Sequence, residues 1–197
     1  MAIELKNITK NFGDNHVLAD FSLRLDEGIT CIMGASGGGK TTIINILAGL
    51  MESDSGEITM PVGTKFSFVF QEDRLLLWED ALQNLLFVVK NPKEQKARAV
   101  ELLAQGGLED SLYKKASELS GGMKRRVAIC RALIADYDVI ILDEPFKGLD
   151  DALKPRIMDM VKEHTAGKVV LVITHEKSEA QYLTTKIVEI LARKEDL

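Results

Sequence analysis

Apolar and polar residues alternate near the N-terminus, across residues 2–10 and again across residues 17–25. Alternation is typical of strands that bury one face and expose the other. Residues 12–15 between them combine glycine with small polar side chains, which favour a turn. The pattern therefore predicts an antiparallel hairpin region at the start of the chain.

Continuous apolar runs mark strands of a different kind, which are buried on both faces. They occupy residues 29–33, 66–70, 139–142 and 169–173, with a last strand expected at 186–191. Helical spacing is found from residue 40 to about 50, with Gly49 in its last turn, and at 151–164 and 177–182. Asp54, Ser55 and Gly56 predict a further turn. Strands that alternate with helices predict an α/β fold with a mainly parallel sheet, covered on both faces.

The stretch from Gln71 to about Asp136 has a different character. It is rich in Leu, Ala, Glu, Gln and Lys, with helical spacing around 81–89, 93–105 and 121–135. We therefore expect one domain over residues 1–197. Its core is formed by residues 1–70 and 137–197, and a helical subdomain by residues 71–136.

Composition narrows the class of protein further. The 197 residues are 46% hydrophobic and carry a formal net charge of −5, so a globular core is expected and a nucleic-acid partner is not. Cys31 and Cys130 lie in apolar surroundings and are interpreted as small buried residues of a reduced, cytosolic protein. We expect no signal peptide and no membrane span, because no sufficiently long apolar run occurs.

The richest basic cluster is Lys124, Arg125, Arg126 and Arg131. Its helical spacing favours a solvated or nucleotide-facing surface over a helix that reads a DNA groove.

The most specific chemical signal is a glycine-rich loop between the strand at 29–33 and the following helix. Glycines let backbone N–H groups approach phosphate oxygens, and the helix adds the positive end of its dipole. This arrangement predicts a P-loop nucleoside triphosphatase, in preference to a flexible glycine-rich turn. Lys40 is expected at the β/γ-phosphates, Thr41 at Mg²⁺ and Thr42 at the α-phosphate. The expected nucleotide-binding residues of this motif are Gly34, Ala35, Ser36, Gly37, Gly38, Gly39, Lys40, Thr41 and Thr42.

Two acids end the apolar strand at 139–142. Ligands of parallel sheets bind at the carboxyl ends of the strands, so Asp143 is expected on the Mg²⁺ side. Glu144 is placed to act on the water that attacks the γ-phosphate. The alternative is a pair of turn acids that solvate a strand end.

A second motif, Leu119-Ser120-Gly121-Gly122-Met123, resembles the signature of the ABC (ATP-binding cassette) ATPases. Ser120 is a good N-cap, and the two glycines present N–H groups at a helix start, which makes a second anion site. In that family this motif binds the γ-phosphate held by the other protomer. The resemblance therefore implies the ABC ATPase fold, with an antiparallel β subdomain, and a head-to-tail dimer that encloses ATP and Mg²⁺. The alternative is a capped helix without a ligand.

The resemblance covers nearly the whole chain and implies four more roles. Phe12 is similar to the aromatic that stacks on adenine, although it could be a core residue of the hairpin. Gln71 resembles the glutamine that senses Mg²⁺ and the attacking water. Asp150 is similar to the dimer-contact residue. His175 resembles the histidine that contacts the γ-phosphate, where a structural histidine is the alternative.

Segments 68–71 and 75–78 resemble the importer ATPases for nitrate, sulfonate and taurine. Met123 departs from the usual glutamine of the signature, Leu77 from a proline and Lys147-Gly148 from Gly-Ala. The stretch between Gly49 and Phe66 is shorter than usual, and no C-terminal regulatory domain is expected.

The resemblance implies an ATPase subunit that is peripheral on the inner face of the cell membrane. Its expected partners are a second copy or a paired ABC subunit, an integral membrane permease and, indirectly, a solute-binding protein. The apolar residues around 75–87 are expected either to dock the permease or to pack the helical subdomain. The alternatives for the whole chain are a soluble ABC ATPase that acts on nucleic acid or ribosomes, and a regulatory module without turnover.

Overall fold

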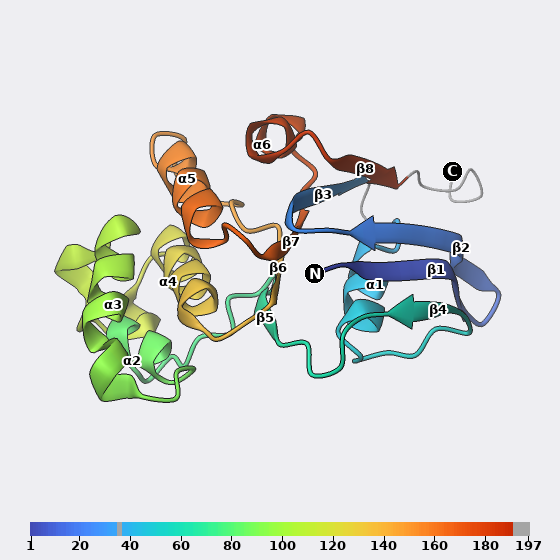
Figure 1. The fold of residues 1–197 in the computed structure, drawn as a ribbon. Helices are drawn as coiled ribbons and strands as arrows, with labels where there is room; N and C mark the ends of the chain where they lie inside the picture. The colour runs from blue at the N-terminus through green and yellow to red at the C-terminus, as the bar shows by residue number, and fades with distance from the viewer. Residues whose placement is uncertain (35–36, 191–197) are drawn as a thin grey trace.

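The computed structural model describes residues 1–34 and 37–190 of the chain. It contains two sheets, with helices on both faces of the parallel one (Figure 1). The strands are β1 (Ile3–Phe12), β2 (Asn15–Leu25), β3 (Gly28–Gly34), β4 (Ser55–Thr59), β5 (Phe66–Val69), β6 (Val139–Asp143), β7 (Val169–Ile173) and β8 (Ile187–Ile190). The α-helices are α1 (Lys40–Leu47), α2 (Ala81–Leu86), α3 (Pro92–Gln105), α4 (Gly121–Ile134), α5 (Lys154–His164) and α6 (Lys177–Leu183). Short 3-10 helices lie at Glu109–Ser111 and Ala116–Glu118.

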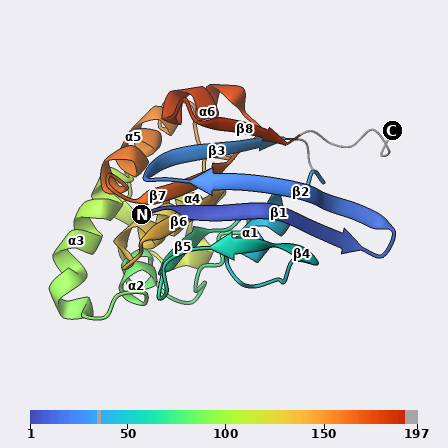
Figure 2. The same ribbon diagram turned by 45° about the vertical axis from the view of Figure 1, so that its right-hand side comes forward.

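The parallel sheet has the strand order β5-β6-β7-β3-β8 and separates two hydrophobic cores. Alternate residues of each strand face opposite cores: Ile140 and Leu142 of β6 pack toward the helices, whereas Val139 and Ile141 pack toward α1 and the antiparallel sheet. All four of these side chains are fully buried. This two-sided burial explains the continuous apolar runs, and it confirms the expected α/β architecture. Figure 2 shows the antiparallel sheet and the parallel sheet from a second side.

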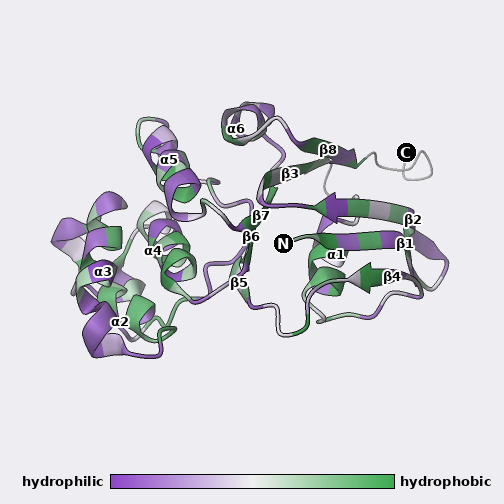
Figure 3. Ribbon diagram, viewed as in Figure 1, coloured by the Kyte–Doolittle hydropathy of each residue, from purple (hydrophilic) through white to green (hydrophobic). Residues whose placement is uncertain are grey.

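The antiparallel sheet has the order β2-β1-β4, and its hairpin follows the predicted pattern. Ile3 pairs with Leu25 and Leu5 with Leu23, so their side chains point into the same core. The turn predicted at residues 54–56 is wrong, however, because Ser55 and Gly56 open strand β4. Figure 3 shows polar and apolar bands along β1 and β2.

The first helix is also shorter than expected. It ends at Leu47, with Ala48 as its C-cap, and Gly49 follows with φ +69° rather than lying inside the last turn. A left-handed glycine after the cap ends a helix because other residues are disfavoured there. The helix expected at 81–89 ends at Leu86 and the one expected at 151–164 begins at Lys154, whereas the strand expected at 186–191 reaches Ile190 and Leu191 lies outside the described residues.

Gly56 is the glycine on which the β1–β4 pairing depends. Its φ is +94°, and a Cβ there would lie 2.5 Å from the carbonyl oxygens of Lys6 and Asn7. We expect Gly56→Ala to lower the free energy of unfolding by about 2–4 kcal/mol, measured by urea denaturation. Gly63→Ala is the matched control, since Gly63 also has positive φ (+82°) but nothing within 4 Å of its Cβ position. It should cost only about 1–2 kcal/mol. Equal losses would show that the close backbone contact is not the cause.

No helix among the described residues combines the length and apolarity that crossing a bilayer requires.

Candidate nucleotide-binding site

The carboxyl ends of four parallel strands meet around one cavity of about 570 Å³. The loop after β3 contributes glycines, β5 leads to Gln71, β6 ends in the two acids and β7 leads to His175. Ten of the predicted site residues line it: Gly34, Gly37, Gly39, Lys40, Thr41, Thr42, Gln71, Asp143, Glu144 and His175. The fold thus gathers residues from both ends of the chain, as expected for a parallel sheet. Val17 and Lys147 also line the cavity and were not predicted.

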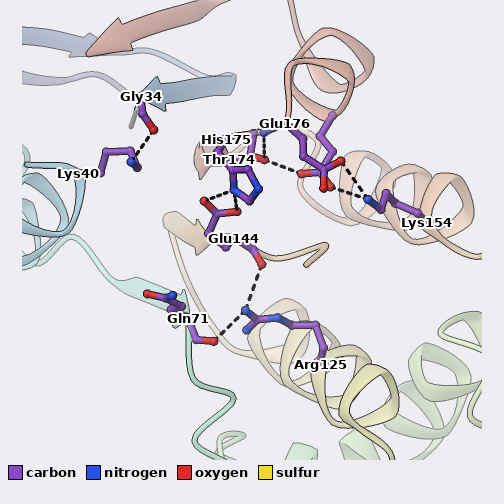
Figure 4. A network of polar contacts seen from close by, with 10 residues as sticks. Gly34, Lys40, Gln71, Arg125, Glu144, Lys154, Thr174, His175 and Glu176 are labelled. Atoms are coloured by element: carbon purple, nitrogen blue, oxygen red, sulfur yellow. Dashed lines mark hydrogen bonds and ion pairs between the residues drawn. The ribbon is translucent and has the colours of Figure 1, made fainter. Parts of the chain in front are cut away.

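The described end of the phosphate loop has a backbone that only glycine adopts readily. Gly37 and Gly39 have φ of +84° and +83°, and Gly39 is the N-cap of α1, where a Cβ would lie 2.9 Å from Leu18. The Nζ atom of Lys40 donates to the Gly34 carbonyl oxygen at 2.7 Å, which places the ammonium at the start of the loop (Figure 4). Backbone N–H groups, a helix N-terminus and a cation therefore converge on one side of the cavity. Ala35 and Ser36 lie outside the described residues.

The opposite side of the cavity is acidic. Burial, and then the charge of Glu144, raise the pKa of Asp143 above its ordinary value, while Arg125 and Lys40 oppose this shift. A cation placed beside Asp143 would favour its ionised form. The Asp143 carboxylate, the Thr41 hydroxyl and the Gln71 amide all offer oxygen ligands, the kind that Mg²⁺ prefers together with substrate phosphates.

Glu144 is held in an uncommon backbone conformation, with φ +49°. Its N–H donates to the Ile173 carbonyl oxygen at 2.9 Å, which ties it to the neighbouring strand. Its carboxylate oxygens lie 2.8 and 2.9 Å from Nδ1 of His175. Strained residues of this kind persist where the surrounding structure fixes them, often at functional sites.

The signature residues Ser120, Gly121 and Gly122 lie at the start of α4, beside a second groove. Ser120 is the N-cap of α4, and its hydroxyl accepts from the Met123 N–H at 3.3 Å. Gly121 and Gly122 line a groove of about 490 Å³ that shares only Gln71 and Lys147 with the phosphate-loop cavity. One chain therefore lines two grooves that adjoin at Gln71 and Lys147, and the second groove also contains the acids Glu72 and Asp73.

Besides the signature residues, three predicted residues among those described do not line the phosphate-loop cavity. Phe12 ends β1 and is 49% exposed, so it is no core aromatic. Asp150 is exposed, and its Oδ1 accepts from the Ala152 N–H at 2.9 Å, just before α5. Gly38 belongs to the loop but is not among the lining residues.

The basic cluster on α4 corrects an expectation. Arg125 and Arg126 are only 4% and 9% exposed and do not form a solvated surface, although Arg125 lines the groove of Gly121 and Gly122. Both guanidinium groups donate to backbone carbonyl oxygens, which satisfies them inside the protein. Cys31 and Cys130 are buried as expected, and burial raises the pKa of each thiol to about 12.

Comparisons with known proteins agree with this geometry. Residues 18–147 match the protein family described as ABC transporter. An aliphatic sulfonates import ATP-binding protein of Pseudomonas syringae pv. syringae is 37% identical over 191 residues, which cover 94% of this chain and 68% of that protein. A taurine import ATP-binding protein of Pseudomonas fluorescens is 37% identical over 187 residues, which cover 87% and 70%. A dimeric, post-hydrolysis structure of the ATP-binding cassette MJ0796 with ADP and Pi is 31% identical, with a TM-score of 0.84 over 95% of this chain and 94% of that one.

The phosphate loop, the paired acids and the parallel sheet define an ATP-hydrolysing P-loop protein. The second glycine motif and the matches narrow that class. The chain belongs to the ABC transporter family, as an ATP-binding and ATP-hydrolysing subunit.

Proposed function

We propose that this subunit powers the import of a small organic solute of the sulfonate or taurine kind through a membrane permease. The observation that supports the proposal is that one chain lines both the phosphate-loop cavity and the groove at Gly121 and Gly122, and exposes large apolar side chains on its helical subdomain. The matched importer subunits, about 37% identical over most of the chain, support the solute class. A solute-binding protein would deliver that solute to the permease.

The proposed chemistry is attack of water on the γ-phosphorus of ATP, which breaks the bond to the β,γ-bridging oxygen and releases ADP and inorganic phosphate. Lys40 and the loop N–H groups bind the phosphates, and Phe12 stacks on adenine. Glu144 accepts a proton from the attacking water, and His175 orients the Glu144 carboxylate through Nδ1 before contacting the γ-phosphate. Mg²⁺, held by Thr41, Asp143 and Gln71, would neutralise the charge that develops on the phosphate oxygens.

The two surfaces are proposed to complete each other in a head-to-tail dimer. Ser120, Gly121 and Gly122 of one copy would close over the γ-phosphate bound to the loop of the other, with Asp150 at the contact. The dimeric cassette that matches in structure supports this arrangement. Residues 71–136 are then a subdomain that carries the closing surface, within one domain of 1–197.

The apolar segment at 75–87 divides into two parts. Leu75, Leu82, Leu85 and Leu86 are buried and pack the helical subdomain. Leu77, Trp78 and Phe87 are 49%, 70% and 75% exposed on either side of α2. Large exposed aromatics are typical of protein contact sites, so this patch is proposed to dock the permease at the inner face of the membrane.

Replacing both exposed aromatics tests the proposed function. We expect Trp78→Ala with Phe87→Ser to keep ATP turnover of the isolated subunit and to weaken its co-purification with a membrane protein by about tenfold or more. Val62→Ser is the control, since Val62 is fully exposed but lies between β4 and β5. Undiminished co-purification of the double variant would contradict docking through this patch. Recovery of the wild-type chain from native cells without any membrane partner would contradict the transport function itself.

A further inference from the structure

A buried arginine joins the signature helix to both strand ends that carry the proposed water-directing residues. Arg125 lies in the first half of α4, and its side chain is only 5% exposed. Its Nη1 donates to the Phe70 carbonyl oxygen at 2.6 Å. Its Nη2 donates to the carbonyl oxygens of Gln71 and Glu144 at 3.0 and 3.1 Å. Figure 4 shows this guanidinium between Gln71 and Glu144.

The charge of Arg125 is compensated in place. Nη1 also lies 3.1 Å from Oδ1 of Asp73, a partly buried carboxylate on the segment that follows β5. Burial raises the pKa of Asp73, and the positive charge of Arg125 opposes this shift. An ion pair removed from water persists only where further hydrogen bonds satisfy it, and the three carbonyl oxygens supply them.

Only a planar fork can make this set of contacts. The guanidinium holds several N–H donors in a rigid plane, whereas a lysine ammonium is a compact point charge on a flexible stem. The acceptors directly follow β5 and β6, two neighbouring parallel strands, and Gln71 and Glu144 line the cavity. Their carbonyl groups belong to the backbone that aims the Gln71 and Glu144 side chains.

We propose that Arg125 is a positioning residue for ATP hydrolysis, which fixes the backbones of Gln71 and Glu144 relative to the helix that begins with Gly121 and Gly122. The inference rests on the proposed roles of Gln71 and Glu144. The strained backbone of Glu144 is then held from two sides. The Glu144 N–H donates to the Ile173 carbonyl oxygen, and the Glu144 carbonyl oxygen accepts from Arg125. A shift of α4 would reach both residues through one side chain.

The other arginines of α4 do not make this connection. Arg126 donates to the carbonyl oxygens of Gly106, Gly107 and Gly122, all within the helical subdomain. Arg131 donates to those of Asp73 and Arg74, on the same connecting segment but beyond Gln71. Arg131 is therefore a matched control for general loosening of that segment.

The test compares Arg125→Lys with Arg131→Lys by steady-state phosphate release and by titration with a fluorescent ATP analogue. Arg125→Lys keeps the charge beside Asp73 but loses the fork. We expect its kcat to fall by about ten- to a hundredfold, because small misplacements of reacting groups have effects of this size. Its affinity for the analogue should stay within about twofold, since the polar contacts of Arg125 with described residues are to Phe70, Gln71, Asp73 and Glu144. Arg131→Lys should change neither quantity by more than about twofold.

Arg125→Gln serves as a second variant in case the lysine variant is not folded, which circular dichroism and nucleotide binding would show. Unchanged kcat in a folded Arg125 variant would overturn the positioning role, as would an equal loss in Arg131→Lys. Lys40→Ala is measured in parallel, so that failure of the positioning role of Arg125 can be distinguished from failure of the proposed nucleotide-binding site. If ATP binding depends on Lys40 while kcat does not depend on Arg125, the inference fails and the proposed function stands. If ATP binding does not depend on Lys40, the proposed site itself fails.

Discussion

Glu144→Gln is expected to lower ATP turnover by at least about a hundredfold while ATP binding persists. Glutamine keeps the size of the side chain and one oxygen toward His175, but it cannot accept the proton of the attacking water. The groups proposed to bind the triphosphate lie on the other side of the cavity, on the loop and Lys40, and are unchanged. Phosphate release and nucleotide titration measure the two effects separately.

The same variant should accumulate an ATP-bound dimer, visible by gel filtration in the presence of ATP and Mg²⁺. Glu176→Gln is the matched control, because Glu176 follows His175 and its loss leaves Lys154 paired with Glu179 at 3.0 Å. It should retain turnover within about twofold. Glu144→Gln with normal turnover would remove Glu144 from its role. A variant that binds ATP and stays monomeric would argue against the enclosed dimer for the isolated subunit.

The buried parallel strands could be predicted because burial on both faces leaves a continuous apolar run in the sequence. Residues 139–142 and 169–173 show it, and both runs form interior strands of the sheet. The antiparallel hairpin could be predicted because one face of β1 and β2 is exposed to solvent, which makes apolar and polar residues alternate along the sequence. In both cases the burial of a strand determines the pattern of apolar residues within that strand.

Strand β4 could not be predicted in this way. Its sequence, Ser-Gly-Glu-Ile-Thr, is polar, mostly exposed and opened by turn-forming residues. It is a strand because it pairs with β1 at the edge of the sheet, Leu5 opposite Ile58 and Glu4 opposite Thr59. Such pairing depends on residues about fifty positions away, which a local pattern does not contain.

The candidate site likewise contains residues whose place could be predicted from the sequence and one, Arg125, whose place could not. The ten predicted residues that line the phosphate-loop cavity could be found because they follow recognisable strands, and parallel strands end at one edge of the sheet. Arg125 could not, since its acceptors are carbonyl oxygens 54 and 55 residues before it and 19 residues after it. Carbonyl groups are present at every position and leave no sequence signal. A charged residue at helical spacing is ordinarily on the surface, and here tertiary contacts reverse that expectation.

Mixing two inactive variants should restore ATP turnover to about a quarter of the wild-type level, if the two pockets of the dimer act independently. Lys40→Ala removes the cation of the phosphate loop, and we expect it to weaken ATP binding by about tenfold or more. Ser120→Asp keeps an N-cap acceptor for α4 but sets a negative charge toward the γ-phosphate. Each variant alone should be nearly inactive, because every pocket of its dimer has one defect.

In an equimolar mixture, about half of the dimers pair the two variants. Each mixed dimer has one pocket built from the intact Lys40 of one chain and the intact Ser120 of the other, and one pocket with both defects. Phosphate release from the mixture, compared with each variant at the same total concentration, measures the composite pocket directly. A pocket completed within one chain would give no recovery at any mixing ratio. Because the ATP-binding cassette that matches this chain in structure is dimeric, recovery is the expected result.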